Sequence, residues 1–320
     1  MKTQYEGWTT ARIPQQIGRQ VVITGATDEI GYAIGLALAK AGADIVLAAG
    51  NEIEGRNALA MIRPAAPAAL VRFEKLDLGS LDSVMDFARR MVRLGRPVDL
   101  LVNAAGACAG MDAAIGPPGK RPVTADGFEL HLGANYLGHF ALTALLLPLL
   151  GRSRQPRVVQ ISSLSHRRGR IDFDDLQSER AYDPWKACCQ SRLALLMFAL
   201  ELQRRSDVHG WGLISAAAHA GYWRGEPFGN GFTPRGLARR LQGSLGFLVS
   251  QSAAVGALPA LFASTAPEVR RGGFYGPSGP LELIGPPGEA RIARAANDPE
   301  TARRLWEVST QLTRVKWPEE

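Results

Sequence analysis

The sequence predicts an α/β fold: a Rossmann-like, doubly wound parallel sheet with helices on both faces, formed as a single domain over residues 1–320. Short apolar runs alternate with helical stretches of roughly 10–15 residues, a pattern typical of right-handed crossovers between parallel strands. The runs are almost continuously apolar, as in strands that are buried on both faces. With 46% hydrophobic and 21% charged residues, the chain has the composition of an ordinary globular domain.

The elements are expected in a regular order along the first two thirds of the chain. The predicted strands cover residues 21–25, 44–50, 69–77, 98–106, 156–163 and 211–219. Amphipathic or apolar helices are expected over 30–42, 80–95 and 191–205. From about residue 222 the alternation gives way to a Gly-rich segment with several aromatic residues.

We expect this segment, about 222–245, to form a lid over the ligand pocket. From about residue 277 to 320 the chain reads as a C-terminal extension punctuated by Pro and Gly. One helix is expected near 299–313, towards the end of this extension.

Composition excludes several classes of partner. The net charge is +7, but the basic residues are mostly arginines scattered along the chain, with the densest cluster, "HRRGR", at 166–170. A nucleic-acid site would require a longer basic stripe with interleaved aromatic residues. The N-terminus lacks the apolar core of a signal peptide, and the apolar run at 140–150 is too short to cross a bilayer. A cytoplasmic protein with no nucleic-acid or membrane partner is therefore expected.

The cysteines point neither to a disulfide scaffold nor to a metal site. There are three, Cys108, Cys188 and Cys189, of which two are adjacent. This number cannot build a disulfide framework, and the spacing matches no zinc pattern. We expect no metal.

Several motifs follow the predicted strands in order. They are "TGATDEIG" at 24–31, "LVNAAG" at 101–106, "NYLGHF" at 135–140, "VVQISSLSH" at 158–166 and "AAAHAGYWRG" at 216–225. Together they resemble the motifs of the short-chain dehydrogenase/reductase family. "WTTARIPQQIGRQ" near the start and "ARRLWEVSTQLT" near the end are similar to the retinol-dehydrogenase-like bacterial branch. The resemblance covers nearly the whole chain and implies the same doubly wound fold.

The resemblance also implies a site for a nicotinamide dinucleotide. The matching cofactor-binding positions are Gly25, Thr27, Glu29, Ile30, Gly31, Asp77, Asn103, Gly106 and Arg192. Among them, Asp77 matches the family residue that touches adenine.

Some of these positions depart from the family pattern. Glu29 stands where the family has the loop glycine that lets the pyrophosphate approach, so its carboxylate is expected to repel a phosphate unless it turns outward. Gly50 replaces the branch's usual arginine for NADP, and no acid marks an NAD ribose site. Ala220 and Gly225 replace a proline and a nicotinamide-binding threonine. The expected cofactor is therefore NADP(H) or none.

The largest departure concerns proton transfer. The family uses a tyrosine as proton donor and acceptor and a lysine four residues later, which one helix face presents together. The matching residues here are Cys188 and Arg192. A thiol is too short to reach the atom that a phenol reaches, and an arginine does not give up its proton. Ser163 and Asn135 match the family's substrate-orienting serine and its structural or water-binding asparagine.

Each of these side chains has two interpretations. Cys188 is either a nucleophile whose thiolate Arg192 stabilises, or a small residue that makes room for a bulkier substrate. Ser163 is either a substrate-orienting hydroxyl or a cap at a strand end, and Asn135 is equally well structural. His219, at the end of the last predicted strand, is expected to make a structural hydrogen bond.

A group of mostly aromatic residues is expected around the mouth of the pocket. Its members are His166, Trp185, Tyr222, Trp223, Phe228 and Phe232. So many aromatic residues on loops favour an apolar or aromatic small-molecule substrate, although lid packing would give the same pattern. His166 is alternatively a solvated loop histidine.

Three functions fit these observations. The first is an enzyme of bacterial specialised metabolism that performs non-redox chemistry, such as cyclisation, isomerisation or dehydration. The second is an atypical NAD(P)H-dependent ketone reductase that takes its proton from the substrate or water. The third is a non-catalytic subunit that binds a ligand or a partner. A homodimer or homotetramer is compatible with all three.

Overall fold

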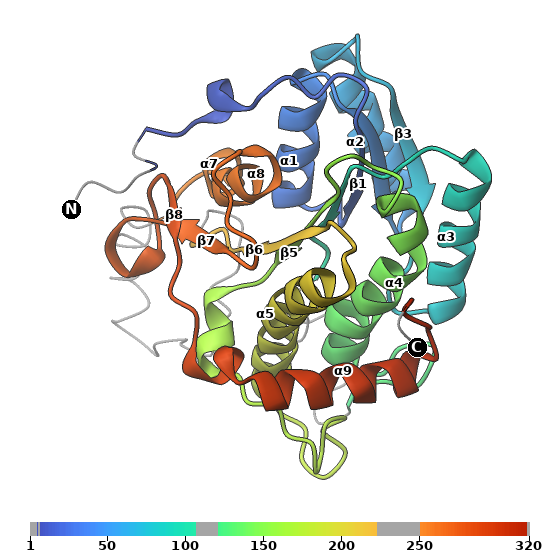
Figure 1. Cartoon of the computed structure of the whole chain (residues 1–320), viewed down its shortest axis with the longest axis vertical. Coiled ribbons are helices and arrows are strands. Elements are labelled where there is room, and N and C mark those ends of the chain that lie inside the picture. The colour runs from blue at the N-terminus through green and yellow to red at the C-terminus, as the bar shows by residue number, and fades with distance from the viewer. Residues whose placement is uncertain (1–4, 6, 107–120, 223–249, 319–320) are drawn as a thin grey trace.

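The computed structural model describes residues 5, 7–106, 121–222 and 250–318, and it contains one sheet of eight strands in the order β3-β2-β1-β4-β5-β6-β7-β8 (Figure 1). The strands are β1 (Gln20–Thr24), β2 (Asp44–Ala49), β3 (Val71–Lys75), β4 (Leu100–Asn103), β5 (Arg157–Ile161), β6 (Ile214–Ala218), β7 (Phe274–Pro277) and β8 (Pro287–Glu289). All neighbouring pairs are parallel except β7 and β8. The predicted doubly wound sheet is confirmed.

The six predicted strands are present, and two further strands extend the sheet. β7 has four residues and β8 has three. Runs this short contain too few side chains to show a periodic pattern, and both include proline. The segment interpreted as an irregular extension from about residue 277 therefore begins within β7 and returns antiparallel to it.

Helices cover both faces of the sheet, and each face has its own apolar core. On one side lie α1 (Glu29–Lys40), α2 (Glu52–Ala65), α7 (Ala253–Gly256) and α8 (Leu258–Thr265). On the other side lie α3 (Leu81–Leu94), α4 (Gly138–Leu150), α5 (Pro184–His209) and α9 (Pro299–Thr313). α9 has the bounds expected from the sequence. α5 begins seven residues before its predicted start, because Asp183 caps it and Pro184 occupies its first position.

Short helical segments connect these elements. They are η1 (Thr10–Arg12), the π-helix η2 (His131–Leu137), η3 (Leu164–Arg168), η4 (Pro280–Glu282) and η5 (Arg294–Asn297). The predicted lid, about 222–245, lies outside the described residues except for Tyr222.

η2 and α4 together form one apolar helix, His131–Leu150, of 20 residues. By length and composition this helix is sufficient to cross a membrane, so the prediction from the 140–150 run alone, that it is too short, was wrong. Its apolar window is 83% buried inside the fold. It packs against α3 and α5, which is how the core helix of a globular domain is placed.

α9 closes the core beyond α4 and α5 (Figure 1). Trp306 of α9 is buried, with its ring 5.0 Å from that of Phe140 and 5.7 Å from that of Phe198. Trp317, which follows α9, lies 4.3 Å from Trp306. The Arg205 guanidinium lies 4.3 Å from the centre of the Trp306 ring. This aromatic cluster ties the C-terminal extension to the central helices.

We expect Trp306→Ala to lower the free energy of unfolding by about 3–5 kcal/mol, because it removes a large buried ring and leaves a cavity. Arg303→Ala, on the exposed side of the same helix, should change it by less than about 0.5 kcal/mol. Urea denaturation of both variants checks this. Equal stability of the two variants would show that α9 does not contribute to the core.

Candidate functional site

The candidate site lies where the strand order reverses, between β1 and β4. In doubly wound sheets, ligands bind at this switch point, outside the carboxyl ends of the strands. A cavity of about 350 Å³ is found there. Its walls come from the loops after β1, β2, β3 and β4 and from the start of η2.

Two glycines allow these loops to come together. Gly25 follows β1 with φ +61°, and a Cβ on it would lie 2.5 Å from Ala105 Cα. A Cβ on Gly31, in α1, would lie 2.2 Å from the Gly25 carbonyl oxygen. Neither position accepts a side chain without movement of the backbone. The β1 loop is therefore compact and exposes its main chain to the cavity.

A buried hydrogen-bond network joins three walls of the cavity at Thr24. Its Oγ1 accepts hydrogen bonds of 3.0 Å from the backbone N–H groups of Ala104 and Ala105. Its hydroxyl proton is then directed to His139 Nε2, 2.8 Å away. His139 Nδ1 in turn donates to the Asn135 carbonyl oxygen at 2.8 Å, in η2. Burial lowers the pKa of His139 to about 4, so the ring is neutral, as this arrangement requires.

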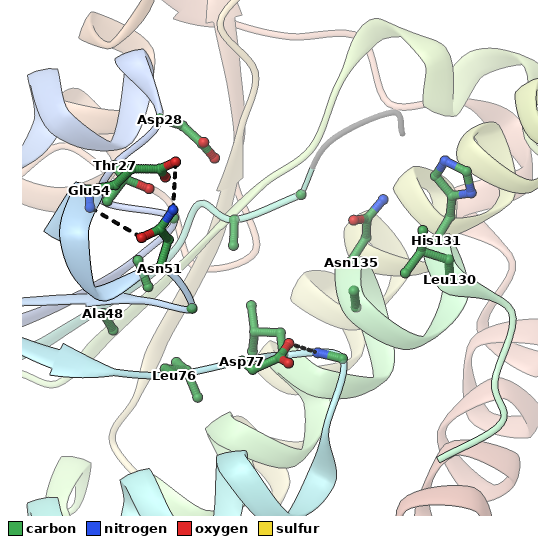
Figure 2. A pocket seen from close by; sticks show the side chains of 18 residues that line it. Thr27, Asp28, Ala48, Asn51, Glu54, Leu76, Asp77, Leu130, His131 and Asn135 are labelled. Carbon is green, nitrogen blue, oxygen red and sulfur yellow. Dashed lines mark hydrogen bonds between the residues drawn. The ribbon is translucent and has the colours of Figure 1, made fainter. Parts of the chain in front are cut away.

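Three carboxylates line the cavity, one from each of the segments after β1, β2 and β3. Figure 2 shows Asp28, Asn51 and Glu54 gathered on one side of the cavity, with Asn135 on the opposite side. Asn51 caps α2, and its Nδ2 donates to Glu54 Oε1 at 2.8 Å. Asp77, at the end of the third strand's loop, accepts a 2.8 Å hydrogen bond from Gly79 N. Desolvation raises the pKa of Asp28, the Glu54 charge raises it further, and Arg192 lowers it.

Comparison with known proteins identifies the family. A family model described as short chain dehydrogenase matches residues 19–174. Mouse polyprenol dehydrogenase is 39% identical over 94% of this chain and 85% of its own length. Mouse retinol dehydrogenase 13 is 36% identical over 92% of this chain and 84% of its own. The chain belongs to the short-chain dehydrogenase family.

A solved structure supports this placement. The crystal structure of an uncharacterised protein from Mycobacterium paratuberculosis is 35% identical to this short-chain dehydrogenase. The match covers 98% of this chain and 99% of that one, with a TM-score of 0.78. The similarity therefore extends through the C-terminal extension as well as the sheet.

Cys188 and Arg192, which the sequence analysis matched to the family's tyrosine and lysine, have no proton-donating geometry of the usual kind. Cys188 is 1% exposed and disulfide-bonded, which is at odds with the hypothesis that it is a thiolate nucleophile. Arg192 Nη1 donates to the Ile161 carbonyl oxygen at 3.0 Å, and its Nη2 donates to the Gly106 carbonyl oxygen. The arginine thus ties α5 to the ends of β5 and of the loop after β4.

Ser163 and Asn135 lie close to this pair in the fold but have structural hydrogen bonds. Ser163 caps η3, accepting a 3.3 Å hydrogen bond from Ser165 N, as in the capping interpretation. Asn135 lines the cavity and donates to Ser191 Oγ at 3.1 Å. Asn135 therefore bridges η2 to helix α5, as in the structural interpretation.

The structure sorts the predicted cofactor-binding residues into two groups. Those that line the cavity are Gly25, Thr27, Asp77 and Gly106. Ile30, Gly31, Asn103 and Arg192 do not line it; Asn103 is buried and donates to Thr143 Oγ1 at 3.1 Å.

Glu29 is the clearest correction within the loop. It is the first residue of α1, it is exposed, and it is not part of the cavity wall. The carboxylate that does reach the cavity from this loop belongs to Asp28. Glu29 therefore has the outward placement that was the stated alternative to repulsion of a phosphate.

The predicted pocket-mouth residues are placed only in part. His166 is fully buried, with its ring 5.2 Å from Phe274, so the solvated alternative was wrong. Trp185 is half-buried near the start of α5, and Tyr222 is buried. Trp223, Phe228, Phe232 and Gly225 lie outside the described residues.

His219 makes the structural hydrogen bond that was expected. Its Nε2 lies 3.0 Å from Glu282 Oε2, and its Nδ1 accepts from Gly221 N at 3.1 Å. Arg167, in the loop after Ser163, binds the same carboxylate oxygen at 2.6 Å. Ala220 accepts from Gln251 Nε2 through its carbonyl, which a proline there would also allow.

Sequence reasoning missed Glu54 and concluded that no acid marks a ribose site. A signal was present: Asn51 followed three residues later by Glu54 is the pattern of a helix-capping box. Such a pattern fixes the first turn of a helix, here directly after β2. That turn faces the cavity, so Glu54 lines it beside Gly50, which has no side chain.

We expect Thr24→Val to lower the free energy of unfolding by about 3 kcal/mol, because it leaves two backbone N–H groups and His139 without their partner. Thr24→Ser keeps the hydroxyl and should retain most of the stability. Thermal and urea denaturation of the pair measure the difference. If the valine and serine variants unfold together, the hydroxyl does not hold the three walls.

Stability should also depend on pH through the buried histidines. Burial lowers the pKa of both His139 and His166 to about 4, below the 6.5 of a free histidine. Between these values the unfolded chain binds protons that the folded chain excludes, so stability is complete above about pH 6.5 and falls as pH decreases towards 4. Each histidine should lower the free energy of unfolding by roughly 2 kcal/mol between pH 7 and pH 5.

Urea titrations across this range test the effect. His166→Phe should remove the contribution of His166 to the pH dependence and leave that of His139. His209→Gln, at an exposed position, should leave the pH dependence unchanged. A free energy of unfolding that is constant from about pH 7 to 5 would contradict neutral burial of both rings.

Proposed function

We propose that this short-chain dehydrogenase binds an adenine dinucleotide in the cavity but does not perform the family's tyrosine-dependent hydride transfer. Its chemistry on an apolar small molecule is non-redox: cyclisation, isomerisation or dehydration. The observation that carries the proposal is the replacement of the tyrosine and lysine by Cys188 and Arg192. The first is buried in a disulfide, and the second is engaged by two backbone carbonyls.

The dinucleotide part rests on the cavity itself. Its position at the switch point, the close approach of Gly25 to Ala105, and the N-terminus of α1 beside it suit a pyrophosphate-linked ligand. Asp77 on the opposite wall matches the family's adenine contact. When bound, such a cofactor would supply or accept a hydride from its nicotinamide ring.

The usual hydride transfer is lost because no side chain at these two positions can donate a proton to the substrate oxygen. A missing or misplaced general acid typically costs about 10²–10⁴ in rate. The Cys188 sulfur offers no proton to a substrate, and a guanidinium such as that of Arg192 is a poor proton donor. A reaction that needs a shaped apolar pocket but no phenol is left unaffected by both substitutions.

An apolar substrate is supported by the similar proteins. Mouse polyprenol dehydrogenase and mouse retinol dehydrogenase 13 are named for long, apolar alcohols. We propose a substrate of this chemical class. We also propose a cytoplasmic location, because the one helix among the described residues that is apolar enough to span a membrane is mostly buried in the core.

A second function, an atypical ketone reductase, is favoured by one specific observation. The adenosine side of the cavity, with Asp77, is retained although the proton donor is replaced. A protein that had lost all dinucleotide chemistry would have no need for this wall. In such a reductase the substrate or a water would supply the proton.

The test is to rebuild the family pair. We expect the wild-type chain to oxidise long-chain prenols or retinol at least about 100-fold more slowly than the double variant Cys188→Tyr/Arg192→Lys, followed by NADH or NADPH absorbance. Adding Ser163→Ala to the double variant should abolish the gained activity, since the serine then orients the substrate. Thermal denaturation confirms that each variant is folded.

Measurable wild-type oxidation equal to or above that of the folded double variant would contradict the proposal and favour the atypical reductase. Product analysis by mass spectrometry on prenol-type substrates without added cofactor distinguishes non-redox turnover, which leaves the mass unchanged or lowers it by one water.

A further inference from the structure

The described residues that line the cavity include carboxylates but no lysine or arginine. Three of the eighteen lining side chains are carboxylates, Asp28, Glu54 and Asp77, and none is lysine or arginine. A nucleotide site that accepts an extra phosphate ordinarily offers an arginine or lysine to it. This cavity offers the opposite charge.

Glu54 is held in the wall by its own helix. Asn51 Oδ1 accepts from Ile53 N at 3.0 Å and from Glu54 N at 3.3 Å, while its Nδ2 binds the Glu54 carboxylate. Turning the side chain away would therefore cost its hydrogen bond with Asn51 Nδ2. Gly50, directly after β2, has no side chain that could screen it.

The place of Glu54 determines what it meets. In doubly wound dinucleotide sites, an acid beyond the second strand binds the ribose hydroxyls of NAD, and an arginine there accommodates the 2′-phosphate of NADP. Both the carboxylate and the phosphate are acceptors with negative charge, so they repel each other and cannot share a hydrogen bond. A ribose hydroxyl can donate to the carboxylate.

We infer that this cavity selects the unphosphorylated adenosine ribose of NAD(H) and rejects the 2′-phosphate of NADP(H), with Glu54 as the discriminating residue. This specificity reverses the NADP(H) expectation from the branch resemblance. It rests on the proposed dinucleotide binding and assigns that site one of the two cofactors.

The other two carboxylates are less suited to this role. Asp77 follows β3 and matches the family residue that touches adenine, so it would meet the base and not the 2′ position of the ribose. Asp28 lies on the β1 loop beside the start of α1, where a pyrophosphate would lie, so it acts on any dinucleotide equally. Only Glu54 distinguishes the two cofactors.

Binding can be measured without any catalysis. Isothermal titration calorimetry with NADH and NADPH measures the affinity for each whole cofactor. Titration with the half-ligands 5′-AMP and adenosine 2′,5′-bisphosphate measures the affinity of the adenosine side alone. We expect NADH to bind at least about 10-fold more tightly than NADPH, and the half-ligands to follow the same order. Glu54→Lys should reverse the order.

Glu52→Lys is the matched control. It makes the same charge change in the same helical turn, but Glu52 is not part of the cavity wall and pairs with Arg56 on the surface. It should leave the order of the two cofactors unchanged. A reversal by both variants would assign the effect to net charge and overturn the role of Glu54.

The outcomes separate the two proposals. If the wild-type chain binds NADPH as tightly as NADH, or more tightly, the inference fails while the proposed dinucleotide site stands. If neither cofactor nor half-ligand binds the folded protein at millimolar concentration, dinucleotide binding itself fails, and the specificity with it.

Discussion

The hydroxyl group of Thr24 is the point on which the geometry of the site depends. A hydroxyl has one proton and two lone pairs, and here all three are used. They join the end of β1, the loop after β4 and, through His139, the π-helix η2. These same three segments form part of the cavity wall, and the loops after β2 and β3 form the rest. Thr24 therefore fixes the position of three of the five wall segments relative to one another at the switch point of the sheet.

Much of the fold was predictable because buried parallel strands leave long apolar runs in the sequence. β7 and β8 were missed because three or four residues carry no periodic signal. That omission also explains the error at His166, whose burial depends on Phe274 in β7. In the site, Gly25, Thr27, Asp77 and Gly106 were predictable from motifs. Glu54 was not, since its place depends on how α2 begins after β2 and not on the residue directly after the strand.

The residues that match the family and those that depart from it differ in how the backbone constrains them. Gly25 and Gly31 have main-chain atoms within 2.5 Å of any added Cβ, so a side chain there would displace the loop. Position 188 lies inside helix α5, where the backbone conformation is compatible with many different side chains as long as they fill the local space. A change of side chain at position 188 leaves the cavity intact, whereas substitution of the loop glycines would not.

The link from His219 and Arg167 to Glu282 has a consequence for biosynthesis. The loop after Ser163 and the end of β6 are made long before Glu282 leaves the ribosome. Until then, Arg167 lacks its carboxylate partner, and so does the buried ring of His219. The residues that line the cavity lie between 25 and 135, so all of them are made before this link can form. The nascent chain can therefore pair its first six strands and form the cavity at the switch point while the loop after Ser163 still lacks its anchor to Glu282.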